Sequence, residues 1–414
     1  MTTMKTKTFL TMAVLTIGLT ITSEMMTSCS NQDNPITDAP CEGSDLPVNF
    51  LESDLSTLFG DYEAHDGEIL TGTLKDNYKI SIADGATVTL SGVTINGVND
   101  NHCTWAGITC EGDATIVLAE GTTNTVKGFH QNYPGIFVPE GKTLTIRGAG
   151  TLIASSDGFG AGIGAGREKS CGTIIIKKEV VKDGKTIAPT IKATGGYNAA
   201  GIGSAQSAAC GDIKIWGGNV TAIRGDAAAC IGAGAYGTCG KIFIYNGTIK
   251  AVENYCGDGD AGAGIGTGTF GVCKDTIKIS GGHVTAKGGV YSPGIGAGYY
   301  GICESKILIT GGTITATGGG NGAGIGSGKL GVVKDEIAIY KEHDSTIDSL
   351  TATAGCGGVP PIGKGLYDRS SKGIYIDGDD GSHAGTATEN LNWTVNTLYD
   401  ENGEKINQWI LTRK

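Results

Sequence analysis

Short runs in which branched hydrophobic residues alternate with polar ones recur along most of the chain. Runs such as Ile277-Lys278-Ile279 and Val284-Thr285-Ala286 place β-branched side chains on one face and Lys or Thr on the other. Gly-Gly and Asn-Gly pairs interrupt these runs too often for helices. The pattern therefore predicts short β-strands with a packed inner face and a solvated outer face.

A longer phrase, Ala-Gly-Ile-Gly-x-Gly, repeats at intervals of 29 to 39 residues. Its isoleucines are Ile163, Ile202, Ile231, Ile265, Ile295, Ile325 and, in a degenerate copy, Ile362. The longer intervals contain insertions at 177–189, 253–260 and 341–349, so the basic unit has about 30 residues. Each unit carries three short β segments. The sequence thus predicts an all-β fold, a right-handed parallel β-helix that forms a three-sided solenoid of about ten coils.

This repeat divides the chain into four parts. Residues 1–29 are expected to form a lipoprotein signal peptide, and the polar, Pro-containing stretch 30–46 a flexible tether. Residues 47–366 are expected to form the β-helix, with 47–65 as its N-terminal cap and coils from about residue 66 onward. Residues 367–414 follow the last glycine phrase, and we expect them to form the last coil and a C-terminal cap.

The N-terminus predicts export and a lipid anchor. Lys5 and Lys7 precede an apolar run over 9–21, and the segment ends at 26–28 in Met-Thr-Ser, directly before Cys29. This arrangement is typical of a lipobox, in which Cys29 is acylated and becomes the mature N-terminus. We expect a protein anchored to the outer membrane or cell surface. A secreted product, or one held by a short membrane segment, is the alternative.

Composition and charge narrow the range of partners. The chain has 71 glycines but only 6% aromatic residues, which fits a turn-rich β protein. Its formal net charge of -11 disfavours nucleic acid, because phosphate binding needs a basic surface. The nearest basic cluster is more typical of a solvated hairpin, and it consists of Lys177, Lys178, Lys182 and Lys185. We expect a monomer that does not bind nucleic acid.

Stacking of equivalent coils turns a repeated residue into a row, and the first such row is made of cysteines. Eight positions after the key isoleucine stand Cys171, Cys210, Cys239, Cys273 and Cys303, and then Val333. A valine in the same position favours an inward, apolar site where the thiol packs as a small hydrophobic group. Disulfides between neighbours are the alternative, and a zinc site fits less well because a straight row does not converge.

A second row alternates in charge along the predicted coils. It contains Lys274, Glu304 and Lys334, while a neighbouring row places Lys306 beside Glu336 and Asp212 beside Lys241. We expect ion pairs between coils, which contribute to register more than to stability.

A third row is aromatic and provides the candidate glycan-binding residues. Tyr236, Phe270 and Tyr300 lie five positions after the isoleucine, Tyr299 flanks them, and Leu330 ends the row. The surrounding glycines predict a turn at this position. The rings would either cover the corner of the coil or pack against the faces of sugars.

Acidic residues offer two candidate cation sites. Asp258 and Asp260 lie in one Asp-Gly insertion, and Asp377, Asp379 and Asp380 in another. Either group could hold Ca²⁺ through hard oxygen ligands, although such clusters are also typical of plain turns. No other cofactor is expected. We assign no catalytic residue, because arginine is scarce in the repeats and the six histidines are scattered.

Residues 87–160 resemble the carbohydrate-binding right-handed β-helix family of bacterial extracellular proteins. The phrases that carry the resemblance are LSGVTI at 90–95, IVLAEGTTNTV at 116–126 and LTIRGAGTL at 144–152. The Ala-Gly-Ile-Gly-x-Gly phrase departs from that family and is similar to repeats of large surface proteins of gut bacteria. The resemblance implies the fold and binding to polysaccharides of the pectic type, and it carries over no ligand residue.

These features together predict a cell-surface lipoprotein. Its elongated β-helix would bind a polysaccharide or host glycan, or act as an adhesin. The alternatives are a polysaccharide lyase or glycoside hydrolase of the β-helix type, and a structural spacer that binds nothing.

Overall fold

The computed structural model describes residues 51–180, 184–252, 262–340, 342, 346–355, 358–368, 373–376, 391–399 and 405–413. All described residues belong to the second of the chain's two units, residues 49–414. Apart from the short 3-10 helix η1 (Leu55–Thr57), the regular elements of these residues are β-strands. Within the described residues no helix is long and apolar enough to cross a bilayer.

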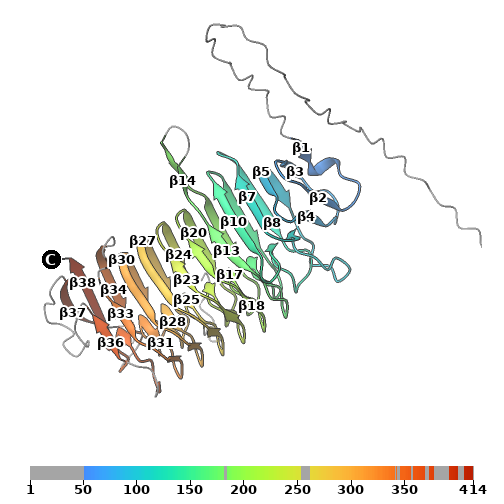
Figure 1. Cartoon of the computed structure of the whole chain (residues 1–414). Helices are drawn as coiled ribbons and strands as arrows, with labels where there is room; N and C mark the ends of the chain where they lie inside the picture. Colours follow the sequence, from blue (N-terminus) through green and yellow to red (C-terminus); the bar gives the residue numbers. More distant parts are fainter. Residues whose placement is uncertain are drawn as a thin grey trace, which may run out of the picture. The chain divides into compact units, whose positions relative to one another are not determined.

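Strands of the second unit pair in parallel with their equivalents one coil further along (Figure 1). The first side contains β1 (Glu52–Asp54), β3 (Ile69–Thr73), β5 (Thr87–Ile95), β7 (Ala114–Leu118), β10 (Thr143–Gly148), β13 (Thr173–Ile176), β19 (Ile213–Ile215), β23 (Ile242–Ile244), β27 (Ile277–Lys287), β30 (Ile307–Thr317), β33 (Ile337–Ile339) and β36 (Ile374–Ile376).

A second side continues from the first around a bend. It contains the later parts of β5, β27 and β30 together with β8 (Thr123–Lys127), β11 (Thr151–Ser155), β16 (Thr190–Thr194), β20 (Asn219–Ile223), β24 (Thr248–Ala251) and β34 (Ile347–Thr353).

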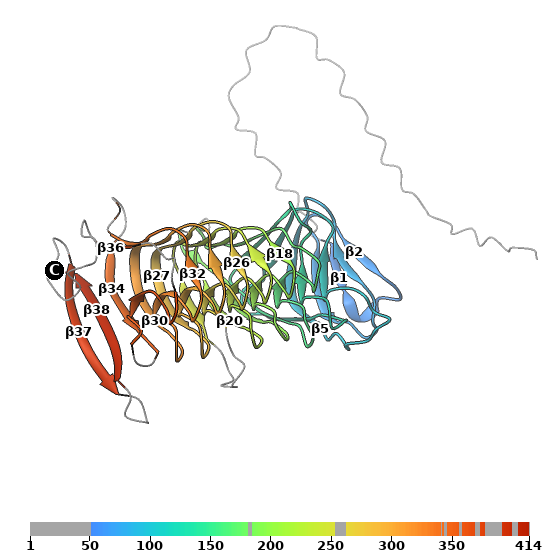
Figure 2. The ribbon, with the colours of Figure 1, turned by 90° about the horizontal axis from the view of Figure 1, so that it is seen from below.

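The third side contributes eleven strands, one from each described coil. They are β2 (Tyr62–Ala64), β4 (Ile80–Ile82), β6 (Ile108–Cys110), β9 (Ile136–Phe137), β12 (Ile163–Gly164), β17 (Ile202–Gly203), β21 (Ile231–Gly232), β25 (Ile265–Gly266), β28 (Ile295–Ala297), β31 (Ile325–Ser327) and β35 (Ile362–Gly363). The predicted right-handed parallel β-helix is confirmed, and Figure 2 shows its coils following one another along the axis.

A short fourth array was not predicted from the sequence. It lies at the cysteine positions and contains β18 (Ala209–Cys210), β22 (Thr238–Cys239), β26 (Val272–Cys273), β29 (Ile302–Cys303) and β32 (Val332–Val333). The insertion at 177–189 contains an antiparallel pair of its own, β14 (Glu179–Val180) with β15 (Thr186–Ile187).

The interior follows the alternation that the sequence shows. Ile277 and Ile279 are fully buried while Lys278 between them reaches the surface, and the third-side isoleucines stack in register at 0% exposure, as Ile231 does against Ile265. Burial of such a column is the main favourable contribution to folding. The stack therefore has one continuous apolar core along the described coils.

In the repeats, the glycine that follows the key isoleucine is required by the close approach of coils. Gly232 has φ +131°, and a Cβ placed on it would overlap the carbonyl oxygen of Gly266 in the next coil. Gly266 has the same relation to Gly296. Any side chain here would force adjacent coils apart.

The ends of the stack differ from the expected boundaries. The first strands begin at Glu52 rather than near residue 66, since β1 pairs in parallel with β3 and β2 with β4. At the other end β37 (Leu391–Tyr399) and β38 (Lys405–Arg413) form an antiparallel hairpin, and β38 pairs antiparallel with β34. Leu411 is buried there, so this hairpin covers a strand edge that would otherwise be open to pairing.

Candidate functional site

The chain turns sharply five residues after each of the seven key isoleucines of the repeat, from Ile163 to Ile362, and we call the residues at these turns the corner row. All seven have a left-handed backbone, with φ between 52° and 62°: Glu168, Ser207, Tyr236, Phe270, Tyr300, Leu330 and Tyr367. The N–H of Tyr236 donates to the Thr269 carbonyl (2.9 Å), and that of Phe270 donates to the Tyr299 carbonyl (3.0 Å). Glycine adopts this backbone at the lowest cost and occupies the equivalent turn of an earlier coil, at Gly141 (φ +77°), yet none of the seven is a glycine, so their side chains are retained against a conformational cost.

Three rings of the corner row stack on one another along the axis. The centroids of Tyr236 and Phe270 are 5.0 Å apart and those of Phe270 and Tyr300 are 4.7 Å apart, each pair with planes 10° from parallel. Tyr299 meets Tyr300 edge-on at 4.6 Å. The faces of Phe270 are therefore covered by its neighbours, and the stack turns ring edges, rather than a flat row of faces, toward solvent.

Exposure differs along this stack in a way that separates its two ends. Tyr236 is 58% exposed, compared with 43% for Phe270 and 40% for Tyr300. Leu330 follows Tyr300 in the next coil, whereas the coil before Tyr236 has Ser207 at the same position. The Tyr236 end thus has an uncovered ring face.

The structure adds two aromatic features that sequence analysis missed. Tyr367 is 60% exposed and occupies the corner after Leu330. It lies five residues after Ile362, the same spacing as in the other coils, and this spacing could have identified it. Trp216 and Tyr245 stack at 3.8 Å with planes 5° apart, directly after β19 and β23. They lie on the first side, nine residues beyond the corner row in each coil, and provide a natural comparison for it.

The five cysteines of the predicted row lie in register. Cys171 pairs with Cys210, which continues through Cys239 and Cys273 to Cys303, and Val333 takes the next position. All five are buried and carry free thiols. Burial raises the pKa of Cys171 and of Cys303, and a hydrogen bond with Cys273, together with burial, raises that of Cys239. The thiols of Cys171, Cys239 and Cys303 are therefore protonated and weakly nucleophilic at neutral pH.

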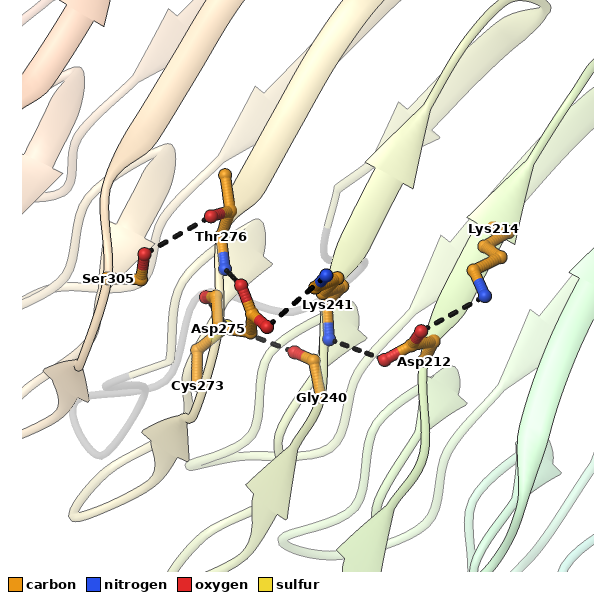
Figure 3. A network of polar contacts seen from close by, with 8 residues as sticks. All are labelled: Asp212, Lys214, Gly240, Lys241, Cys273, Asp275, Thr276 and Ser305. Carbon is orange, nitrogen blue, oxygen red and sulfur yellow. Dashed lines mark hydrogen bonds and ion pairs between the residues drawn. The ribbon is translucent and has the colours of Figure 1, made fainter. Parts of the chain in front are cut away.

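The charged row forms contacts between coils, with different partners from some of those expected. Lys334 pairs with Glu304 at 3.1 Å and Lys306 with Glu336 at 3.6 Å, as the spacing predicts. The Asp212 carboxylate instead pairs with Lys214 at 3.0 Å and accepts the backbone N–H of Lys241 at 2.9 Å (Figure 3).

Figure 3 shows how this network continues along the axis. The Lys241 ammonium lies 3.5 Å from Asp275, whose carboxylate accepts the N–H of Thr276. The thiol of Cys273 donates to the Gly240 carbonyl at 3.3 Å. The network joins the polar surface to the buried thiol row and fixes the register of successive coils.

A pocket of about 340 Å³ lies beside the corner row. Three stacked glycines, Gly172, Gly211 and Gly240, line it because larger side chains are absent there, and Lys274 takes the equivalent position in the next coil. Ala209 and Thr238 also line the pocket, two residues after Ser207 and Tyr236 respectively. Lys274 forms no ion pair among the described residues, in contrast to the expected pairing within its row.

Several predicted site residues lie outside the described residues. They are the lipid-anchor candidate Cys29 and the cation-site candidates Asp258, Asp260, Asp377, Asp379 and Asp380. Among residues that the structure does describe, no group of three or more His, Cys, Asp or Glu side chains is arranged to hold a metal ion.

Comparison with known proteins gives the same class as the geometry. A family model for the beta helix repeat matches five segments, 144–167, 189–206, 213–235, 277–299 and 307–329. The chain is thus a parallel β-helix protein that is similar to this repeat over part of its length. No curated protein and no solved structure matches it. Of the stretch 87–160, only 144–160 falls within the matched segments.

Proposed function

We propose that this protein is a cell-surface lipoprotein that binds polysaccharide or host glycan through the corner row. Acyl chains on Cys29 would anchor it to the outer membrane or cell surface, and the β-helix would hold the rings along a rigid edge. It would act as a monomer.

The exposed ring stack of Tyr236, Phe270 and Tyr300 carries this proposal. Large aromatic side chains that are 40% to 58% exposed in three successive coils bury little surface for the fold. They also occupy a left-handed turn that disfavours any side chain. Rings with an apolar face and a polar edge are typical of sugar recognition, so binding explains both features.

A polysaccharide array tests the proposal. The full chain, in detergent, is applied to neutral glycans, pectic galacturonans and host glycans, and both retention and released sugar are read in the same wells. Retention without release supports the proposed function. Release of sugar would instead establish a lyase or hydrolase, and the absence of both would favour a structural spacer.

The anchor is tested separately by Cys29→Ser. Labelled fatty acid supplied to the cells is expected in the natural protein and not in the variant, because the acyl chains are attached at Cys29, whereas the apolar run over 9–21 would hold either protein in a membrane if it stayed uncleaved. Equal labelling of the two proteins would contradict the anchor.

A further inference from the structure

The ring stack ends abruptly at Tyr236, and we call this point the Ser207 step. Ser207 precedes Tyr236 in the corner row, and its N–H donates to the Ala235 carbonyl at 3.0 Å, so the two positions are direct neighbours. A side chain of one hydroxymethyl group stands where the next three coils carry rings. The face of Tyr236 turned toward Ser207 is therefore uncovered, which agrees with its higher exposure of 58%.

The far side of the Ser207 step is polar. Glu168 occupies the preceding corner, and its N–H donates to the Gln206 carbonyl at 3.1 Å. Its carboxylate side chain is 70% exposed. Tyr236 and Glu168 are thus two coils apart, about 9.6 Å along the axis, with Ser207 between them. This separation leaves the space of one ring in the row.

Two cations flank the step, and both are already engaged. Arg167 lies 3.6 Å from the Glu168 carboxylate, and its guanidinium lies over the ring of Phe159 at 4.6 Å. Lys169 donates to the hydroxyl of Tyr133 and lies over that ring. A carboxylate on this ligand would meet the negative charge of Glu168 at the step, where both cations are engaged; Lys274, which forms no ion pair among the described residues, lines the neighbouring pocket instead. The net charge of -11 also disfavours an anionic ligand.

We propose that a single neutral pyranose ring binds at the Ser207 step, with its apolar face on Tyr236 and its hydroxyls directed at Ser207 and Glu168. The proposal rests on the proposed function and specifies it further. A pyranose has an apolar C–H face and a polar edge, which matches an aromatic face beside a hydroxyl and a carboxylate. The glycine-lined pocket next to Ala209 and Thr238 leaves room for sugars linked to the first.

Leu330 shows which substitution can cover the Tyr236 face without disturbing the turn. It occupies the same left-handed corner at the opposite end of the stack, next to Tyr300, which is only 40% exposed. The substitution Ser207→Leu therefore introduces a side chain that this turn accepts elsewhere, and it places that side chain against the Tyr236 face. Ser207→Ala keeps the face uncovered, and Trp216→Ala removes an exposed stacked ring from another side of the coil.

Affinities are measured with the full chain in detergent, using short neutral galactan and glucan oligosaccharides and galacturonan of equal length. Ser207→Leu and Tyr236→Ala are each expected to weaken binding of the retained neutral oligosaccharide by about tenfold or more. Trp216→Ala is expected to stay within about twofold. Ser207→Ala keeps the Tyr236 face uncovered but removes a hydroxyl that faces the sugar, so it should weaken binding by about two- to fivefold, less than Ser207→Leu does. Thermal melting of each variant confirms that the fold is intact.

The outcomes separate this inference from the proposed function. Loss of binding in Tyr236→Ala with full binding in Ser207→Leu would place the sugar on ring edges and overturn the Ser207 step, while glycan binding would stand. Failure of the natural protein to bind any glycan on the array would overturn the proposed function itself. Tighter binding of galacturonan than of the neutral chains would overturn the assignment of a neutral sugar, whereas improved galacturonan binding by Glu168→Gln alone would support it.

Discussion

The cysteine row and the corner row run through the same turns, three residues apart, and meet opposite surroundings. Cys239, Cys273 and Cys303 are 0% exposed, whereas Tyr236, Phe270 and Tyr300 are 40% to 58% exposed. Both rows arise from the same register of coils. The comparison shows that stacking converts any repeated residue into a row, and that the direction of the side chain decides whether the row packs in the core or faces solvent.

The two rows also differ in the residues they accept. The buried row contains only cysteine and, at Val333, a similarly small apolar residue. The seven members of the corner row are an acid, a serine and five bulky residues of three types, Tyr, Phe and Leu, with no glycine among them. Packing density limits the first row, while the second is limited by its left-handed backbone and not by packing against the core.

Introducing a charge into each row should give the largest difference in stability between the two rows. We expect Cys239→Asp to destabilise the fold by about 3 kcal/mol or more, because its carboxylate would lie unpaired in the core. Tyr236→Asp, at the exposed corner of the same turn, should change stability by less than about 1 kcal/mol. Chemical denaturation followed by circular dichroism measures both. Equal effects would contradict the inward and outward assignment.

The second largest effect should be a loss of stability at alkaline pH, caused by the buried thiols. The pKa of Cys239 is raised by its hydrogen bond with Cys273, that of Cys303 is raised by burial, and burial raises that of Cys110 to about 12. Unfolded thiols titrate near 8.5, so the folded state retains these protons to higher pH. Their contribution to stability is complete below about pH 8.5 and is lost as pH rises toward the folded pKa.

The melting temperature should therefore fall between about pH 8 and about pH 10. A variant with Cys239→Val and Cys303→Val should show a smaller fall, because two of the titrating groups are gone. An unchanged pH profile in that variant would mean that the buried thiols do not contribute to it.

Replacement of one thiol by valine should have a smaller effect on stability. We expect Cys239→Val to change the free energy of unfolding by less than about 1.5 kcal/mol, because Val333 already fills the same position in a later coil. The unfolding midpoint in denaturant is the measurement. A loss comparable with that of Cys239→Asp would show that the row depends on the thiols themselves.

The ion pair between Lys334 and Glu304 should matter least. Both side chains are about half exposed, at 52% and 42%, so solvent screens the 3.1 Å contact. We expect Glu304→Gln to cost about 0.2 to 1 kcal/mol, and less at high salt. The same titration with and without added salt tests this, and a loss that salt leaves unchanged would point to packing instead.

Sequence alone predicted the coils because the repeat of Ile231, Ile265 and Ile295 records the register directly. It also placed Tyr236, Phe270 and Tyr300 on one row. It could not predict that their rings cover one another, since ring orientation depends on χ angles that spacing does not set. It missed the partner of Lys241, because long side chains choose among several acids within reach.

The ends of the stack were least predictable for the same kind of reason. The first coil begins at Glu52, before the first copy of the glycine phrase. Only the parallel pairing of β1 with β3 identifies this coil. Tyr367 was not identified from the sequence because Leu330 interrupts the row of rings one coil earlier.

The most direct test of the account compares two pairs of surface rings by their effect on binding to the glycan that the array retains. Tyr236→Ala with Tyr300→Ala removes two corner rings, and Trp216→Ala with Tyr245→Ala removes a stack of similar size from the first side. The account predicts that the corner variant loses about tenfold or more in affinity while the first-side variant binds as the natural protein does. Equal affinities in the two variants, or a loss confined to the first-side variant, would contradict the corner row as the glycan-binding site.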